Sequence, residues 1–286
     1  MKNILIATTA LMLSAGIAAA ESHAAPVTVS GNARMGVMNN GTDTAFTSRV
    51  RASLKMSGTT DGGLSFGGSF DVHNAAAAAN GSSGSVFLSG AFGKIAMGDV
   101  DSAVQAAVGQ VDQKSLLVLD GPQEVPHIGG GASADDPSLL YSFTTGNISL
   151  FLGATDGKTG IGGAADERIS VGAKFATDKF SVGVGFADDG AATETSVGGS
   201  ATFGAATVKA VVSDRDDALG MNFALSVSGT FSGVGVTAFF RDGDSLVDPN
   251  IGVGASYDLG GGATVVGGVG SVAGSTVADL GVSFSF

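Results

Sequence analysis

The chain has 286 residues, no cysteine, 47 glycines and a formal net charge of −12 at pH 7. Without cysteine no disulfide framework can support the fold, and the acidic balance argues against nucleic-acid binding, which requires a basic surface. Many Val, Phe, Ala and Thr residues, together with abundant Gly and few Pro, indicate β-strands joined by tight turns.

The first segment predicts export. Lys2 precedes the apolar run 4–20, whose last residues, Ala18, Ala19 and Ala20, fit a signal-peptidase site. We therefore expect residues 1–20 to be a cleaved signal peptide and residues 21–286 to form one domain. Beyond residue 20 no apolar run approaches the roughly 20 residues that a transmembrane helix needs.

From Val27 onward, short segments alternate between apolar and polar residues. Arg49 and Arg51 alternate with Val50 and Ala52, and the same period of two continues to the last strand, 278–286. Very short connections alternate with longer polar ones along the chain. These features are typical of strands that present one face to lipid and one to a lumen. We predict an all-β fold: a transmembrane antiparallel up-and-down β-barrel of about 16 strands.

The alternation stops between Asp99 and Pro137. Long segments without regular structure inside a compact domain are uncommon and usually functional. This one is acidic, with a single basic residue, Lys114. We predict that residues 99–137 form a long third loop that folds inward and constricts the lumen.

Charged residues of opposite sign are expected to face one another at this constriction. The basic side, on the lumen face of the first two strands, comprises Arg34, Arg49, Arg51 and Lys55. The acidic side, on the loop, comprises Asp99, Asp101, Asp112, Asp120 and Glu124. Such rings of charge set the selectivity of a pore. No cofactor is required, although the carboxylates of Asp99, Asp101 and Asp120 could bind Ca²⁺ through their oxygens; their spacing matches no EF-hand loop.

The chain resembles the alphaproteobacterial, Rhodobacter-type porins along its whole mature length. Segments 27–34 and 92–103 carry the resemblance, together with Phe286, whose terminal aromatic ring resembles the assembly signal of outer-membrane barrels. The resemblance implies a homotrimer in the Gram-negative outer membrane, in contact with lipid. It also implies insertion by the barrel assembly machinery and passive diffusion of small hydrophilic solutes and ions. Two features depart from related porins: the chain has only two Tyr and no Trp, and its loop lacks a Pro-Glu-Phe-Gly motif.

Other functions remain open at this point. A secreted, Gly-rich, acidic β-protein such as an adhesin would need repeats that the sequence does not contain. A barrel plugged by its loop would be structural. Nothing marks a nucleophile beside any of the three histidines, so no enzyme is indicated. The acidic total suggests a mild cation preference, but the mixed charges at the constriction decide the permeating ion.

Overall fold

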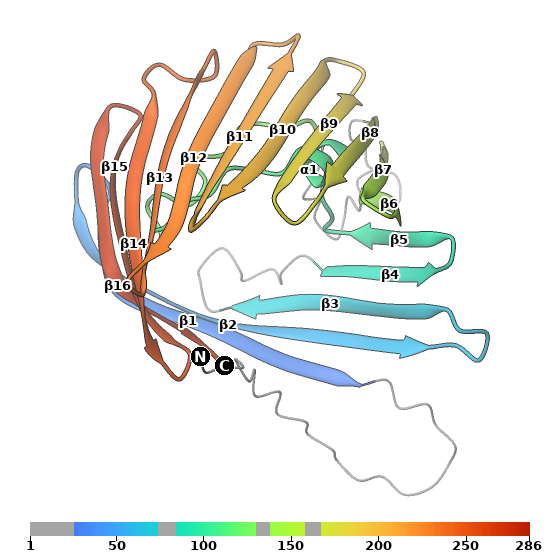
Figure 1. The fold of residues 1–286 in the computed structure, drawn as a ribbon, viewed down its shortest axis with the longest axis horizontal. Coiled ribbons are helices and arrows are strands. Elements are labelled where there is room, and N and C mark those ends of the chain that lie inside the picture. Colours follow the sequence, from blue (N-terminus) through green and yellow to red (C-terminus); the bar gives the residue numbers. More distant parts are fainter. Residues whose placement is uncertain (1–25, 74–83, 130–137, 158–166) are drawn as a thin grey trace, which may run out of the picture.

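The computed structural model describes residues 26–73, 84–129, 138–157 and 167–286. The expected signal peptide and the end of the expected loop, 130–137, lie outside the described residues. Sixteen strands form a closed barrel in which β1 pairs with β16 and every strand is antiparallel to its neighbours (Figure 1). The predicted all-β barrel is confirmed.

The strands follow one another directly in the chain, except where a helix and its flanking loop intervene between β5 and β6. The helix is α1 (Ala103–Val108). The strands are β1 (Val27–Asn39), β2 (Thr44–Thr59), β3 (Ser65–His73), β4 (Gly84–Gly90), β5 (Gly93–Gly98), β6 (Ser138–Thr145), β7 (Ile148–Asp156), β8 (Glu167–Ala176), β9 (Phe180–Asp188), β10 (Thr193–Phe203), β11 (Ala206–Arg215), β12 (Met221–Phe231), β13 (Val234–Gly243), β14 (Asn250–Gly260), β15 (Ala263–Val272) and β16 (Ser275–Ser285).

The two ends of the barrel differ in their connections. One end carries short turns, such as 204–205 between β10 and β11, and the other carries longer loops, such as 244–249 between β13 and β14. The pattern expected from the sequence is thus confirmed. The alternation of residues 218–231 predicts a strand that begins at Ala218. The strand β12 begins instead at Met221, because Asp217 accepts a hydrogen bond from the Leu219 N–H (2.9 Å) and Gly220 takes a positive φ of 53°.

The outer wall is apolar, as the alternation predicts. On β9 the side chains of Phe180, Val182, Val184 and Phe186 are exposed, whereas the intervening Gly183 and Gly185 are buried against the barrel contents. Exposed Phe side chains flank the short turns, where aromatic rings suit the boundary between lipid and water; these are Phe175, Phe180, Phe203 and Phe231. In the described segments no helix has the length and apolar character needed to cross a membrane.

The apolar core lies inside the barrel. Val104, Val108 and Ile128 of the loop segment are buried against Val211 and Ala224 of the inner wall. A second, smaller cluster joins Leu119 of the loop to wall residues Phe239 and Val277. The described part of the expected loop, 99–129, is therefore folded into the lumen and packed there.

Candidate pore constriction

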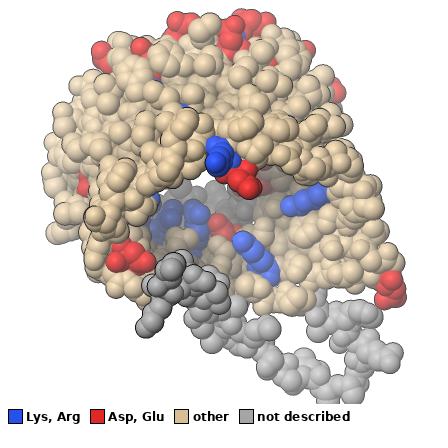
Figure 2. Space-filling view, in the orientation of Figure 1, with Lys and Arg blue, Asp and Glu red and all other residues tan. Residues whose placement is uncertain are grey.

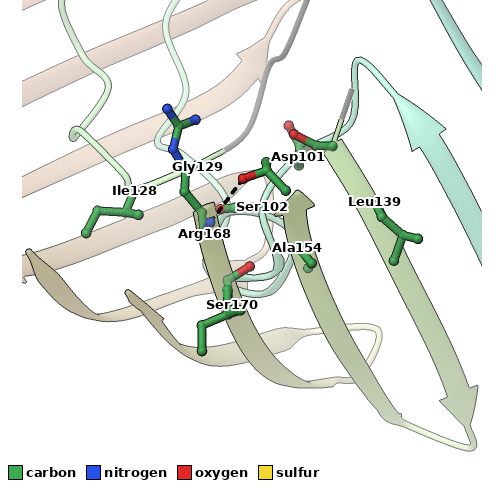
Figure 3. A pocket seen from close by; sticks show the side chains of 12 residues that line it. Asp101, Ser102, Ile128, Gly129, Leu139, Ala154, Arg168 and Ser170 are labelled. Carbon is green, nitrogen blue, oxygen red and sulfur yellow. Dashed lines mark hydrogen bonds between the residues drawn. The ribbon is translucent and has the colours of Figure 1, made fainter. Parts of the chain in front are cut away.

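The loop enters the lumen through α1. The Ser102 hydroxyl accepts a hydrogen bond from the Gln105 N–H (3.2 Å) and so caps the helix. The next backbone N–H, of Ala103, donates to the hydroxyl of Ser170 on β8 (3.0 Å). Figure 3 shows this junction, with Asp101, Ser102 and Ser170 beside a small cavity of about 10 Å³. The helix is thereby fixed to the wall at its first residue.

Glycines in the wall make room for α1. A Cβ at Gly183 of β9 would lie 2.1 Å from the carbonyl oxygen of Ala107, and one at Gly172 of β8 would lie 2.3 Å from that of Ala103. These distances are far shorter than any contact that real Cβ atoms make. Because the inner face of β8 and β9 carries glycine at these positions, the helix backbone can rest directly on the strands.

Asp279 of β16 holds the next part of the loop. Its carboxylate is buried and accepts backbone N–H bonds from Leu116 (3.0 Å), Leu117 (2.6 Å) and Val118 (2.7 Å). A fourth bond comes from the N–H of Gly268 on β15 (3.0 Å). Hydrogen bonds to a charged acceptor are roughly twice as strong as neutral ones, so Asp279 is a strong anchor for segment 114–119.

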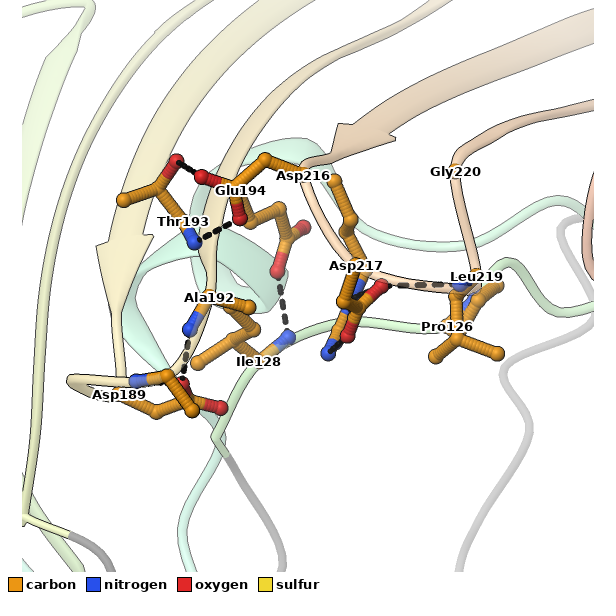
Figure 4. Close-up of polar contacts among 12 residues, drawn as sticks. Pro126, Ile128, Asp189, Ala192, Thr193, Glu194, Asp216, Asp217, Leu219 and Gly220 are labelled. Atoms are coloured by element: carbon orange, nitrogen blue, oxygen red, sulfur yellow. Dashed lines mark hydrogen bonds and ion pairs between the residues drawn. The ribbon is translucent and has the colours of Figure 1, made fainter.

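Glu194 of β10 holds the end of the described loop. Its carboxylate accepts from the N–H of Ile128 (Figure 4) and forms a hydrogen bond of 2.5 Å with Nδ1 of His127. The hydroxyls of Ser196 (2.6 Å) and Ser213 (3.1 Å) donate to the same carboxylate. The His127 and Glu194 side chains are only 2% and 0% exposed, so this is a buried polar cluster with several partners.

Asp112, which was expected to belong to the constriction, also serves as an anchor. Its carboxylate forms an ion pair with Lys209 of β11 (2.7 Å) and accepts from the hydroxyl of Ser228 on β12 (3.2 Å). Its backbone N–H donates to the Ser226 hydroxyl (2.9 Å). The structure therefore turns Asp112 toward β11 and β12, away from the basic residues of β1 and β2.

A cavity of about 430 Å³ remains between the loop and the opposite wall. Arg34 of β1, Arg49 of β2, and Lys114 and Asp120 of the loop line it. Arg34 and Arg49 are direct partners in the β1–β2 register. In Figure 2 basic side chains lie around the hollow of the barrel, while acidic ones gather along the upper rim. The cavity brings together two of the expected basic residues and one expected carboxylate.

The other two expected basic residues differ in their surroundings. Arg51 forms an ion pair with Asp71 of β3 (3.3 Å), and Asp71 also accepts from the Ser53 hydroxyl (2.5 Å). Lys55 is exposed, pairs in register with Thr28, and lies toward the short-turn end of β2. Arg51 is thus held against the wall beside the cavity, and Lys55 lies apart from it.

The remaining expected carboxylates lie elsewhere on the loop. Desolvation by the surrounding protein and then the charge of Asp99 raise the pKa of Asp101. Desolvation and then the charge of Asp120 raise the pKa of Glu124. In the described parts of the chain no three His, Asp or Glu side chains gather closely enough to hold a metal ion. Asp99, Asp101 and Asp120 accordingly do not assemble the expected Ca²⁺ ligand set, and calcium binding itself stays an untested prediction.

Sequence reasoning missed four residues of this site. Lys114 is the lone cation of the acidic segment, and Asp71 and Asp279 occupy positions that the strand alternation assigns to the lumen face, so the sequence marked each of them. Glu194 also occupies a lumen-facing position, but no other feature of the sequence marked it. The alternation of Gly with Val in β9 could also be seen in the sequence. These glycines do not mark tight turns; they form an inner surface on which the loop can pack.

Three comparisons identify the family. A family model of Gram-negative porins matches residues 7–276. A porin of Rhodobacter capsulatus is 38% identical over 91% of this chain and 100% of its own length. A porin structure refined at 1.8 Å has a TM-score of 0.78 at 36% identity, with 91% of this chain and 100% of that chain covered.

A variant of Rhodopseudomonas blastica porin has the same coverage and a TM-score of 0.77 at 22% identity, which shows the fold alone. The match to the family model and the Rhodobacter relative cover nearly the entire described barrel. The chain therefore belongs to the family of Gram-negative porins and forms a channel in the outer membrane.

Proposed function

We propose that this porin is a passive diffusion channel for small hydrophilic solutes and ions, constricted where Arg34, Arg49 and Arg51 of the wall face Asp120 of the loop. The observation that carries the proposal is the cavity of about 430 Å³ that Arg34 and Arg49 of the wall and Asp120 of the loop line; Arg51 lies beside it, paired with Asp71. Opposite charges across a narrow lumen orient polar solutes and set selectivity. In this proposal the protein selects solutes by size and charge and does not catalyse a reaction.

Liposome swelling with neutral sugars of increasing size tests this function. The purified protein should admit small sugars and progressively reject larger ones. The double variant Arg34→Ala, Arg49→Ala removes two long side chains from the constriction, so larger sugars should enter faster. Lys179→Ala, which removes a cation from an exposed short turn, is the control and should leave the size limit unchanged. A folded protein without any swelling would support a plugged barrel.

The same protein is proposed to assemble as a homotrimer through the outer face of β4 and β5, the shortest strands. Val86 and Met97 are exposed apolar side chains on this face (61% and 44%). Met97→Trp should disrupt a close contact between protomers and lower the yield of unboiled trimer on gels. Val184→Trp, on the outer face of β9, should face lipid and leave the trimer intact. An unchanged trimer in both variants would place the contact on other strands.

Export and insertion complete the proposal. We infer that residues 1–20 are removed and that the barrel assembly machinery recognises the strand ending in Phe286. The Phe286 N–H donates to the Gly31 carbonyl (2.9 Å), so the same residue extends the β1–β16 pairing. N-terminal sequencing should begin at Glu21, and Phe286→Ala should reduce insertion. Insertion at the normal level would assign recognition to other residues.

A further inference from the structure

Several carboxylates of the lumen already have partners. Asp112 is paired with Lys209 and Asp71 with Arg51. Asp279 accepts only backbone N–H bonds. The negative charge of these groups is thereby used to hold the loop or the wall, and little of it remains to attract a cation into the cavity.

The cations that line the cavity have no such partners. Among the described residues no carboxylate oxygen lies within 4.0 Å of the side-chain nitrogens of Arg34, Arg49 or Lys114. The Nε atoms of Arg34 and Arg49 are also buried without a hydrogen-bond partner there. Of the described carboxylates, only that of Asp120 lines this space; it is exposed and accepts a hydrogen bond of 3.4 Å from Gln113. The lining therefore carries three cations against one anion.

The position of the two arginines adds a second argument. Arg34 and Arg49 are directly opposite in the β1–β2 register, and like charges in this arrangement repel. Arg49 is held by a hydrogen bond from its Nη2 to Asn32 (3.0 Å), so it is oriented before a solute arrives. An oxyanion placed between the guanidinium groups would relieve the repulsion and accept paired N–H bonds, which phosphate and carboxylate do well.

We propose that this cavity is a binding subsite for small solutes that carry a phosphate or carboxylate group, and that the channel consequently prefers anions although the protein carries a net charge of −12. The inference rests on the proposed diffusion function. Lys114 supplies a third positive charge from the loop side. Gly262 and Ser285, at the short-turn end, also line the cavity, so solutes reach the subsite from that end of the barrel.

Planar bilayers test the inference through two readouts. The first is the reversal potential across a salt gradient at low ionic strength, where charges are least screened. The second is the block of KCl current by inorganic phosphate, with acetate as a carboxylate probe. We expect an anion-selective reversal potential and a saturable block by phosphate, with a weaker block by acetate because it carries less charge.

Three variants locate the effect. Arg34→Gln and Lys114→Gln should each shift the reversal potential toward the cation side and raise the half-blocking phosphate concentration about tenfold, equivalent to about 1.4 kcal/mol. Lys179→Gln removes the same charge from an exposed short turn and should behave like the wild type. A block by acetate with none by phosphate would assign the subsite to carboxylates alone.

Two results would overturn the inference while leaving the diffusion function intact: a cation-selective wild type, or shifts in the cavity variants no larger than in Lys179→Gln. Sugar-induced swelling would continue in both cases. A folded protein that shows neither swelling nor conductance would instead refute the proposed function, and the subsite would fall with it.

Discussion

The Asp279 carboxylate is the anchor whose alteration should affect the channel most directly. Its Oδ1 accepts from the N–H groups of Leu116 and Gly268, and its Oδ2 from those of Leu117 and Val118. Asp279→Asn replaces one of these oxygens by an NH₂ group, so two N–H donors lose their acceptor whichever way the amide turns. Each such buried group costs about 1–3 kcal/mol, so the two together cost roughly 2–6 kcal/mol. At least one of the two donors belongs to segment 114–119, which should therefore be held less tightly.

Single-channel recording measures the consequence. Because only one of the four bonds, from the Gly268 N–H, lies between the strands, the barrel should still form, but the loosened segment should move in the lumen and increase the open-channel current noise. Asp258→Asn is the matched control: Asp258 is exposed and its side chain accepts one backbone bond, from Gly260 (2.8 Å). Equal noise in the two variants, with equal thermal stability, would refute the anchoring role of Asp279.

Four further predictions follow from the same contacts. Glu194→Gln should destabilise the folded protein by about 1–3 kcal/mol, because at least one buried donor of the cluster, the Ile128 N–H in the most favourable amide orientation, loses its acceptor when an oxygen becomes NH₂; thermal unfolding followed by heat-modifiable gel mobility measures it. Gly183→Ala should displace α1, since its Cβ would meet the Ala107 carbonyl at 2.1 Å, and lower the unfolding temperature, whereas Gly68→Ala on the outer face should be tolerated. The pKa values of the loop carboxylates Asp101 and Glu124 are raised. As the pH falls, these two carboxylates therefore become neutral at a higher pH than ordinary carboxyl groups do. The reversal potential should therefore move toward anions at mildly acidic pH, and a move toward cations would contradict this. Addition of Ca²⁺ to chelator-treated protein tests the calcium prediction: a change in conductance at constant ionic strength would support binding at Asp99, Asp101 and Asp120, and an unchanged conductance would contradict it.

The barrel could be predicted because its determinants are local. Each strand needs only an alternation of outward apolar and inward polar residues, and each turn needs a few small residues. The start of β12 was misplaced by the same local reasoning, since Ala218 and Leu219 look like strand residues. There the side chain of Asp217 binds the Leu219 N–H and turns the chain before pairing begins.

The course of the loop could not be predicted because its partners are distant in sequence. The alternation of inward and outward residues along each strand shows that Lys209 and Asp279 face the lumen, but it does not show which loop residue contacts them. Asp112 is 97 positions from Lys209, and nothing in either segment distinguishes that pairing from one with Arg49. The wall glycines carried the missing information, because a side chain at Gly172 or Gly183 would exclude the helix.

The overall charge of the protein is also a poor guide to what its lumen attracts. A net charge of −12 suggests a cation channel, yet a permeating ion responds mainly to charges within about a Debye length, roughly 8–10 Å at physiological salt. Many of the acidic side chains lie on the rim (Figure 2) or, like Asp112 and Asp279, hold the loop in place. The unpaired Arg34 and Arg49 line the cavity itself, so the local balance of charge has the opposite sign from the total.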